Sequence, residues 1–78
     1  MTNSDLFLTS DLSLSSALLC KGFTLESVKK LQPKSQFLFY KSEKLDETIK
    51  DFWAGKLAVE PKSYFNCLKE IKSRLYQN

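Results

Sequence analysis

The stretch from Ser42 to Gly55, SEKLDETIKDFWAG, constrains the fold most, because it is an amphipathic helix with signals at both ends. Apolar side chains and one threonine recur every three or four residues and so lie along one side of the helix: Leu45, Thr48, Ile49, Phe52 and Trp53. Ser42 is placed as the N-cap, and Gly55 can take the left-handed conformation that ends a helix. Because Trp53 is the only tryptophan and lies on the apolar side, we expect it in the core, with the other elements packed around it.

Two stretches are typical of β-strands. Leu6–Thr9 is short, with Leu6 and Leu8 on one side and Phe7 on the other, and Gln36–Lys41 (QFLFYK) is the strongest strand in the chain. Phe37 and Phe39 point to one side of that second strand, and Leu38 and Tyr40 point to the other. Both of its sides are therefore apolar.

The segment from Phe23 to Leu31 is compatible with two structures. Phe23 and Leu25 alternate as in a strand, whereas Leu25, Val28 and Leu31 are spaced as in a short helix that Thr24 would cap. We favour a strand, because the turn residues Gln32–Ser35 connect it directly to the strand at Gln36–Lys41. Together they would form a basic hairpin.

Two further helices flank this middle region. The first is expected to be capped by Thr9 or Ser10, with Asp11 in its first turn, and to end at Gly22. Its apolar positions are Leu14, Ala17 and Leu18. The last helix is expected from Pro61 to about Tyr76, after an extended connector at Lys56–Glu60. Its apolar side carries Tyr64, Leu68, Ile71 and Leu75.

These elements predict an α+β fold with the order β-α-β-β-α-α, in which helices pack on a three-stranded, mainly antiparallel sheet. The chain of 78 residues is long enough for one small domain and too short for two, so we expect residues 1–78 to form a single compact domain. No apolar run is long enough to cross a bilayer, and the N-terminus lacks the positive region of a secretory signal. We therefore expect a cytoplasmic protein without a membrane partner.

The two cysteines, Cys20 and Cys67, each lie among apolar residues of an expected helix. A small secreted fold that depends on disulfides usually has more cysteines. We interpret both as buried free thiols in a reducing cytosol, with a disulfide between them as the alternative.

Catalysis is not indicated. The chain has no histidine, which removes the commonest general base and metal ligand. The cysteines lack the spacing of a zinc site, and no glycine-rich phosphate loop or nucleophile elbow is present. The carboxylates of the central helix fall mainly on its solvent side: Glu43, Asp46, Glu47 and Asp51. We expect no catalytic residues, no metal and no cofactor.

The positive charge is concentrated in two parts of the chain. The net charge is +3, and residues 23–41 and 56–78 each carry +3, whereas residues 42–55 carry −2 and residues 1–22 carry −1. A basic hairpin and a basic last helix could share one surface that contacts phosphates, with neighbouring aromatic rings stacking on bases. The candidate nucleic-acid-binding residues are Lys29, Lys30, Lys34, Lys41, Lys62, Lys69, Lys72, Arg74 and Tyr76. The alternative is that these lysines only form a solvated face.

Several short motifs resemble those of an uncharacterised small-domain family of bacteria and their phages. They are T-x-D-L at residues 9–12, L-x-x-x-G-F at 18–23, F-x-F at 37–39, F-W-x-G-K-L-x-V-x-P at 52–61 and K-x-R-L-Y at 72–76. The resemblance covers nearly the whole chain, and the motif at 52–61 is its most specific part. It supports the fold and implies a phage or mobile-element setting, but it carries over no functional residue.

Two functional hypotheses follow. In the first, the protein is a small non-enzymatic accessory protein of a phage or mobile element that binds DNA or RNA. In the second, it is a protein-interaction module that modulates a host or phage complex, or a homodimeric structural protein, and uses an apolar face of the sheet that no helix covers. Salt dependence separates the two, because phosphate contacts weaken steeply with salt and apolar interfaces do not.

Overall fold

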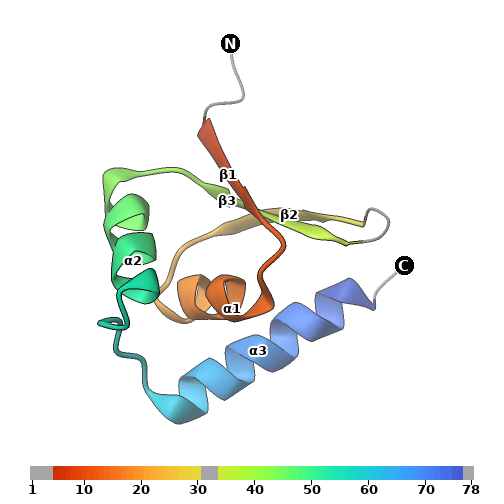
Figure 1. The fold of residues 1–78 in the computed structure, drawn as a ribbon. Helices are drawn as coiled ribbons and strands as arrows, with labels where there is room; N and C mark the ends of the chain where they lie inside the picture. Colours follow the sequence, from red (N-terminus) through yellow and green to blue (C-terminus); the bar gives the residue numbers. More distant parts are fainter. Residues whose placement is uncertain (1–4, 31–33, 77–78) are drawn as a thin grey trace.

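The computed structural model describes residues 5–30 and 34–76, and its elements follow the predicted order β-α-β-β-α-α (Figure 1). They are β1 (Leu6–Thr9), α1 (Leu12–Cys20), β2 (Leu25–Lys29), β3 (Gln36–Tyr40), α2 (Glu43–Trp53) and α3 (Pro61–Leu75). The strands form one antiparallel sheet in the order β1-β3-β2, so β3 is central. The predicted α+β fold is confirmed.

The ambiguous segment after Phe23 is a strand. β2 pairs with β3, and an irregularity between Leu25 and Ser27 shifts the register of the pair. The helical alternative is wrong for residues 25–29, because they pair with β3. Leu31, the last residue of the segment, lies outside the described residues. Of the predicted turn, Gln32 and Pro33 lie outside the described residues.

The core lies between one face of the sheet and the three helices. Figure 1 shows α1, α2 and α3 on the same side of the sheet. Phe37 and Phe39 of β3 point into this layer, where they are 2% and 0% exposed. They form one buried cluster with side chains from β2 and from every helix: Leu14, Leu18, Leu25, Leu45 and Ile71. Each helix therefore contributes to the same core.

The helix ends follow the sequence signals, with one correction. Gly22 and Gly55 have φ of 96° and 74°, and each directly follows the C-cap of its helix, as predicted. The Ser42 hydroxyl accepts a hydrogen bond from the Leu45 N–H at 3.0 Å, as an N-cap does. For α1, however, the cap is Asp11, whose Oδ1 accepts from the Leu14 N–H at 2.9 Å. Thr9 instead accepts a hydrogen bond from the Asp11 N–H, and the expectation of a Thr9 or Ser10 cap is wrong.

The expected position of Trp53 is also wrong. Its side chain is 64% exposed, and its ring meets Phe52 edge-on, with 4.9 Å between the ring centroids. Trp53 is the last residue of α2 and lies about 80° around the helix from Leu45, which is fully buried. It therefore stands at the edge of the apolar stripe, where the core ends, and the chain packs around Leu45, Phe37 and Phe39 instead.

The other face of the sheet is not covered by a helix in the described part of the chain (Figure 1). Leu6 pairs with Tyr40 across the strands, and Leu8 pairs with Leu38, so these four side chains share that face. Leu8 and Tyr40 are 44% and 53% exposed, whereas Leu38, in the central strand, is buried. The expected apolar outer face is present, and we call these four residues the outer sheet patch.

Candidate functional site

Helix α3 begins with a carboxylate cap. Pro61 occupies the first turn, and the Glu60 carboxylate accepts hydrogen bonds from the backbone N–H groups of Ser63 at 2.8 Å and Lys62 at 3.2 Å. The Ser63 hydroxyl donates a third hydrogen bond to it, at 2.9 Å. The bonds from Ser63, followed by that from Lys62, lower the pKa of Glu60 below its ordinary value. The cap thus fixes the start of the helix and keeps Glu60 charged.

The side of α3 that faces the rest of the protein is the apolar side predicted from the sequence. Ile71 is fully buried, and Tyr64, Leu68 and Leu75 are half-buried, as expected for one apolar face against α1 and the sheet. The Tyr64 hydroxyl donates a long hydrogen bond of 3.5 Å to the Ser13 carbonyl of α1. This packing sets the rotation of α3 and so determines which side chains point outward.

The outward side of α3 carries lysines and exposed aromatic rings on one arc. At about 100° per residue, five exposed side chains fall within roughly 80° of one another. These residues are Lys62, Phe65, Lys69, Lys72 and Tyr76, which we call the α3 stripe. Phe65 is 58% exposed and Tyr76 is 80% exposed, and the Lys69 ammonium lies 5.7 Å from the centre of the Phe65 ring. The stripe contains no acidic residue.

Arg74 is not part of this stripe. It lies about 120° around the helix from Lys62, and its guanidinium is 3.7 Å from the Glu70 carboxylate. This ion pair offsets part of its charge. The structure therefore separates Arg74 from the three lysines with which the sequence grouped it.

The hairpin lysines divide into two groups. Lys29 and Lys30 lie where β2 ends, and Lys34 lies just before β3 begins, so these three exposed residues form what we call the hairpin end. The hairpin end lies beside the C-terminal end of α3 (Figure 1). Lys41 follows the opposite end of β3, about 24 Å from Lys34 along an extended strand.

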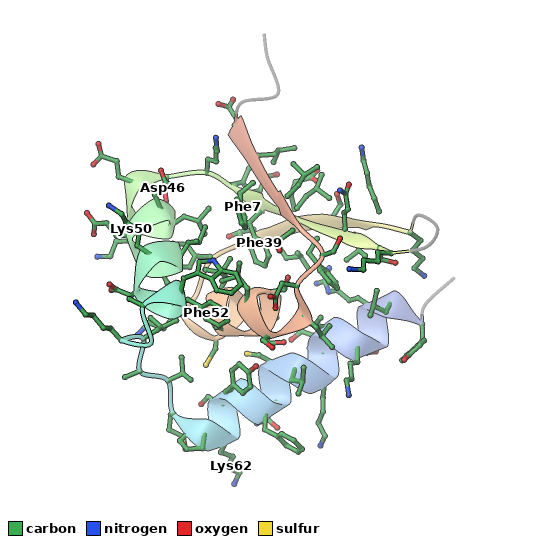
Figure 2. All side chains as sticks on the ribbon, viewed as in Figure 1. Phe7, Phe39, Asp46, Lys50, Phe52 and Lys62 are labelled. Atoms are coloured by element: carbon green, nitrogen blue, oxygen red, sulfur yellow. The ribbon has the colours of Figure 1, made fainter. Side chains whose placement is uncertain are left out.

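The predicted residues thus come together only in part. The hairpin end meets the end of α3 that carries Lys72 and Tyr76. Lys62 lies at the far end of α3, about 15 Å along the helix axis from Lys72, and its side chain points away from the sheet (Figure 2). Lys41 is remote from both groups.

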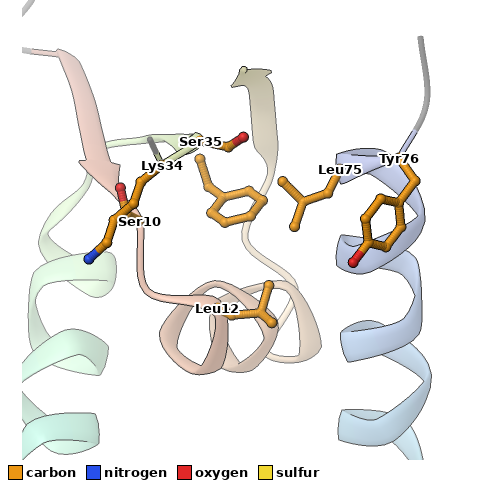
Figure 3. A pocket seen from close by; sticks show the side chains of 7 residues that line it. Ser10, Leu12, Lys34, Ser35, Leu75 and Tyr76 are labelled. Carbon is orange, nitrogen blue, oxygen red and sulfur yellow. The ribbon is translucent and has the colours of Figure 1, made fainter. Parts of the chain in front are cut away.

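A cavity of about 420 Å³ lies where the hairpin end meets α3 (Figure 3). It is lined by residues from four parts of the chain: Ser10, Leu12, Lys34, Ser35, Phe37, Leu75 and Tyr76. Phe37 is almost fully buried and forms the floor, whereas Ser10, Lys34 and Tyr76 are exposed and form the rim. Of these, sequence reasoning named only Lys34 and Tyr76 as site residues. No sequence signal marks the cavity, because it depends on the distance between two elements that are far apart in the chain.

The acidic side of α2 faces away from the other helices. Glu43, Asp46, Glu47 and Asp51 are all exposed, as expected, and Figure 2 shows Asp46 and Lys50 on the outer side of α2. In residues 5–30 and 34–76, no three Cys, Asp or Glu side chains are arranged to hold a metal ion. Within the same residues, no helix has the length and hydropathy needed to span a bilayer.

Both cysteines are free thiols, as expected, but they are half-buried and not fully buried. Burial is the main cause that raises the pKa of the Cys67 thiol above its ordinary value. The neighbouring Cys20, on α1, contributes next, through its charge and a side-chain hydrogen bond. The two thiols therefore lie together between α1 and α3.

Comparisons with curated proteins and with solved structures found no match for this chain. A family model does match, and it covers residues 4–77, which is nearly the whole sequence. This agrees with the expected membership of an uncharacterised family of small domains. The chain belongs to the family described as domain of unknown function DUF5659.

Proposed function

We propose that this protein is a small non-enzymatic module that binds nucleic acid through the α3 stripe, with the hairpin end contributing further cations. The observation that carries the proposal is the exposure of Phe65 and Tyr76 among three lysines on one face of α3. A helix face that serves only solubility needs charge and no aromatic rings. Exposed rings between cations are what a phosphate backbone with unstacked bases would use.

The dimensions and charges of the stripe support this function. From Lys62 to Tyr76 the stripe is about 21 Å long, so it can contact several successive phosphates of one strand. The one ion pair among the described residues joins Glu70 to Arg74 and does not involve a lysine of the stripe. The acidic side of α2 lies on another side of the molecule (Figure 2).

A bacterial or phage cytoplasm is the proposed setting. The motif resemblance supports a phage or mobile-element origin, and the two free thiols are compatible with a reducing compartment. In this setting the protein would act as an accessory factor on DNA or RNA.

The outer sheet patch supports a second candidate function, a protein-interaction module or homodimer. Leu8 and Tyr40 expose apolar surface on a sheet face that no helix covers in the described residues. An interface of this kind would depend weakly on salt and would be lost on changing Leu8 and Tyr40, with the α3 lysines having no effect.

The test of the proposed function compares two triple variants of equal charge. The stripe variant is Lys62→Gln, Lys69→Gln and Lys72→Gln, and the control variant is Lys44→Gln, Lys50→Gln and Lys56→Gln. All six lysines are exposed, so both variants should keep the fold, with a stability change within about 0.5 kcal/mol for each substitution.

Fluorescence anisotropy of a labelled single-stranded oligonucleotide of about 12 nucleotides, at ~50 mM salt, gives the affinities. We expect the stripe variant to bind at least tenfold more weakly than wild type and the control variant to bind within about threefold of it. Equal losses of affinity in both variants would mean that binding depends on the net charge of the protein and not on the α3 stripe. A lack of binding by wild type to DNA and RNA of either strandedness would reject the function and favour the protein partner.

A further inference from the structure

The cavity at the end of α3 has the chemistry of a small-ligand site. Its floor and walls are apolar, formed by Phe37, Leu12 and Leu75. Ser10, Tyr76 and Lys34 stand at its rim, and the Lys34 side chain extends outward from there (Figure 3). The cavity is largely open to solvent, and its volume of about 420 Å³ lies within the usual range for ligand pockets.

The polar groups restrict what such a site would hold. Among residues 5–30 and 34–76, no carboxylate lines the cavity, so no side chain that the structure describes neutralises Lys34 there. In Figure 3, Ser10 and Lys34 stand on one side of the space, and Leu75 and Tyr76 stand on the other. A ligand that satisfies all of these groups has a flat, largely apolar ring with polar edges and one attached anion. A nucleotide has this combination.

The position of Tyr76 connects the cavity to the α3 stripe. Tyr76 is the last residue of the stripe and also part of the cavity rim, and at 80% exposure its ring is accessible from outside. A strand that follows the stripe toward the C-terminal end of α3 therefore arrives at the cavity. Lys34 stands on the opposite rim, and in Figure 3 its ammonium points away from Tyr76, so a change of rotamer would bring it to the next phosphate.

From this continuity we infer that the cavity binds one unpaired nucleotide, with its base between the apolar walls and Tyr76 and its phosphate at Lys34. The inference rests on the proposed nucleic-acid function and specifies its substrate as single-stranded. A base that is stacked within a duplex cannot enter a pocket without leaving the stack, which costs free energy. A single strand has no such cost, so the cavity would confer a preference for single strands.

The test uses three single variants. Tyr76→Ala removes the stacking ring, Tyr76→Phe keeps it, and Ser35→Leu fills part of the cavity from a half-buried position. Each is titrated with a single-stranded oligonucleotide, with a duplex of the same length, and with a single strand that carries abasic sites. Far-ultraviolet circular dichroism and thermal melting identify any variant that does not fold.

We expect wild type to prefer the single strand over both the duplex and the abasic strand. Tyr76→Ala and Ser35→Leu should each lower single-strand affinity by roughly 5- to 100-fold, the range expected for one lost base contact. They should leave duplex and abasic-strand affinity within about twofold, and Tyr76→Phe should retain most of the single-strand affinity.

Two results would contradict the assignment of the cavity as a nucleotide-binding site while leaving the proposed function intact. One is that wild type binds the abasic strand as tightly as the normal strand, which would mean that only phosphates are contacted. The other is that folded Tyr76→Ala and Ser35→Leu variants bind all three probes like wild type. If wild type binds none of the probes, the proposed function itself fails, and the cavity assignment fails with it. If Ser35→Leu does not fold, Tyr76→Ala and Tyr76→Phe are compared on the normal and abasic strands. Equal affinities of these two variants for the normal strand would then contradict the assignment of the cavity.

Discussion

Ser15 places a fully buried hydroxyl group in the middle of α1 without a hydrogen-bond partner among the described residues. Such a group loses its bonds to water on folding and gains nothing in return. Alanine also has the higher helix propensity. We therefore expect Ser15→Ala to raise the free energy of unfolding by about 1 kcal/mol, measured by urea denaturation.

Ser16 is the control for this prediction. It is equally buried, but its hydroxyl donates a 2.9 Å hydrogen bond to the Leu12 carbonyl. Ser16→Ala leaves the Leu12 carbonyl without this hydrogen bond, so the free energy of unfolding should rise less than in Ser15→Ala. A Ser15→Ala variant that is less stable than wild type would show that the hydroxyl has a partner in solution.

Trp53 gives a second prediction at the scale of one residue. Because its ring is 64% exposed, its fluorescence should be red-shifted and accessible to iodide, and Trp53→Ala should cost about 1 kcal/mol or less. Leu45→Ala, at a fully buried position of the same helix, should cost about 2–5 kcal/mol. A blue-shifted emission shielded from iodide would contradict the structure and favour a core tryptophan.

At the scale of elements, the cap of α3 makes its stability depend on pH. The Glu60 carboxyl group accepts its hydrogen bonds more strongly when charged, so its lowered pKa means that protonation weakens the cap. This stabilisation is present above the ordinary pKa of 4.5 and is lost as pH falls through the lower pKa of the folded state. We expect Glu60→Gln to lower the melting temperature at pH 7 and to reduce its fall in acid.

Glu43→Gln is a suitable control for that measurement. Glu43 is the first residue of α2, but the cap of α2 is the Ser42 hydroxyl. Removing the Glu43 carboxylate should therefore alter the acid transition less than removing that of Glu60. If wild type and Glu60→Gln show the same melting temperature at pH 7 and the same decline in acid, the carboxylate cap contributes no measurable stability.

Most elements could be predicted from the sequence, because local chemistry determines them. Glycines at the left-handed positions and a serine cap marked three helix ends correctly. Alternation placed Phe37 and Phe39 on one side of β3 but, because both sides are apolar, did not show which side faces the core. Local rules failed where two candidates competed nearby. Asp11 has the better position to cap α1 than Thr9 or Ser10, because its carboxylate reaches the Leu14 N–H.

Tertiary packing determines which residues are buried and which distant residues lie together, and the periodicity of the sequence could not show either. Trp53 fits the apolar stripe of α2, but the edge of that stripe is covered only if another element reaches it. The α3 stripe was predictable from helical spacing, whereas the meeting of Lys34 with Tyr76 was not, because it depends on how the hairpin and α3 are placed. The cavity between them therefore had no signature in the sequence.

At the scale of the whole molecule, the arrangement leaves two contrasting surfaces. All three helices cover one face of the sheet, so the outer sheet patch is on the other side of the molecule from the helix layer (Figure 1). Helix α3 belongs to that layer and turns its lysines and aromatic rings outward. The two surfaces are separate, so changes to one should not affect binding at the other.

The salt dependence of nucleic-acid binding tests whether the lysines of the α3 stripe contact phosphates. Affinities of wild type, the stripe variant and the control variant are measured for one single-stranded oligonucleotide over a series of salt concentrations. Each phosphate contact contributes about 0.7 to the slope of log affinity against log salt on a single strand. We expect Lys62→Gln, Lys69→Gln and Lys72→Gln together to flatten the slope by about 2, while the control variant keeps the wild-type slope. Binding by the stripe variant with an unchanged slope would contradict this expectation.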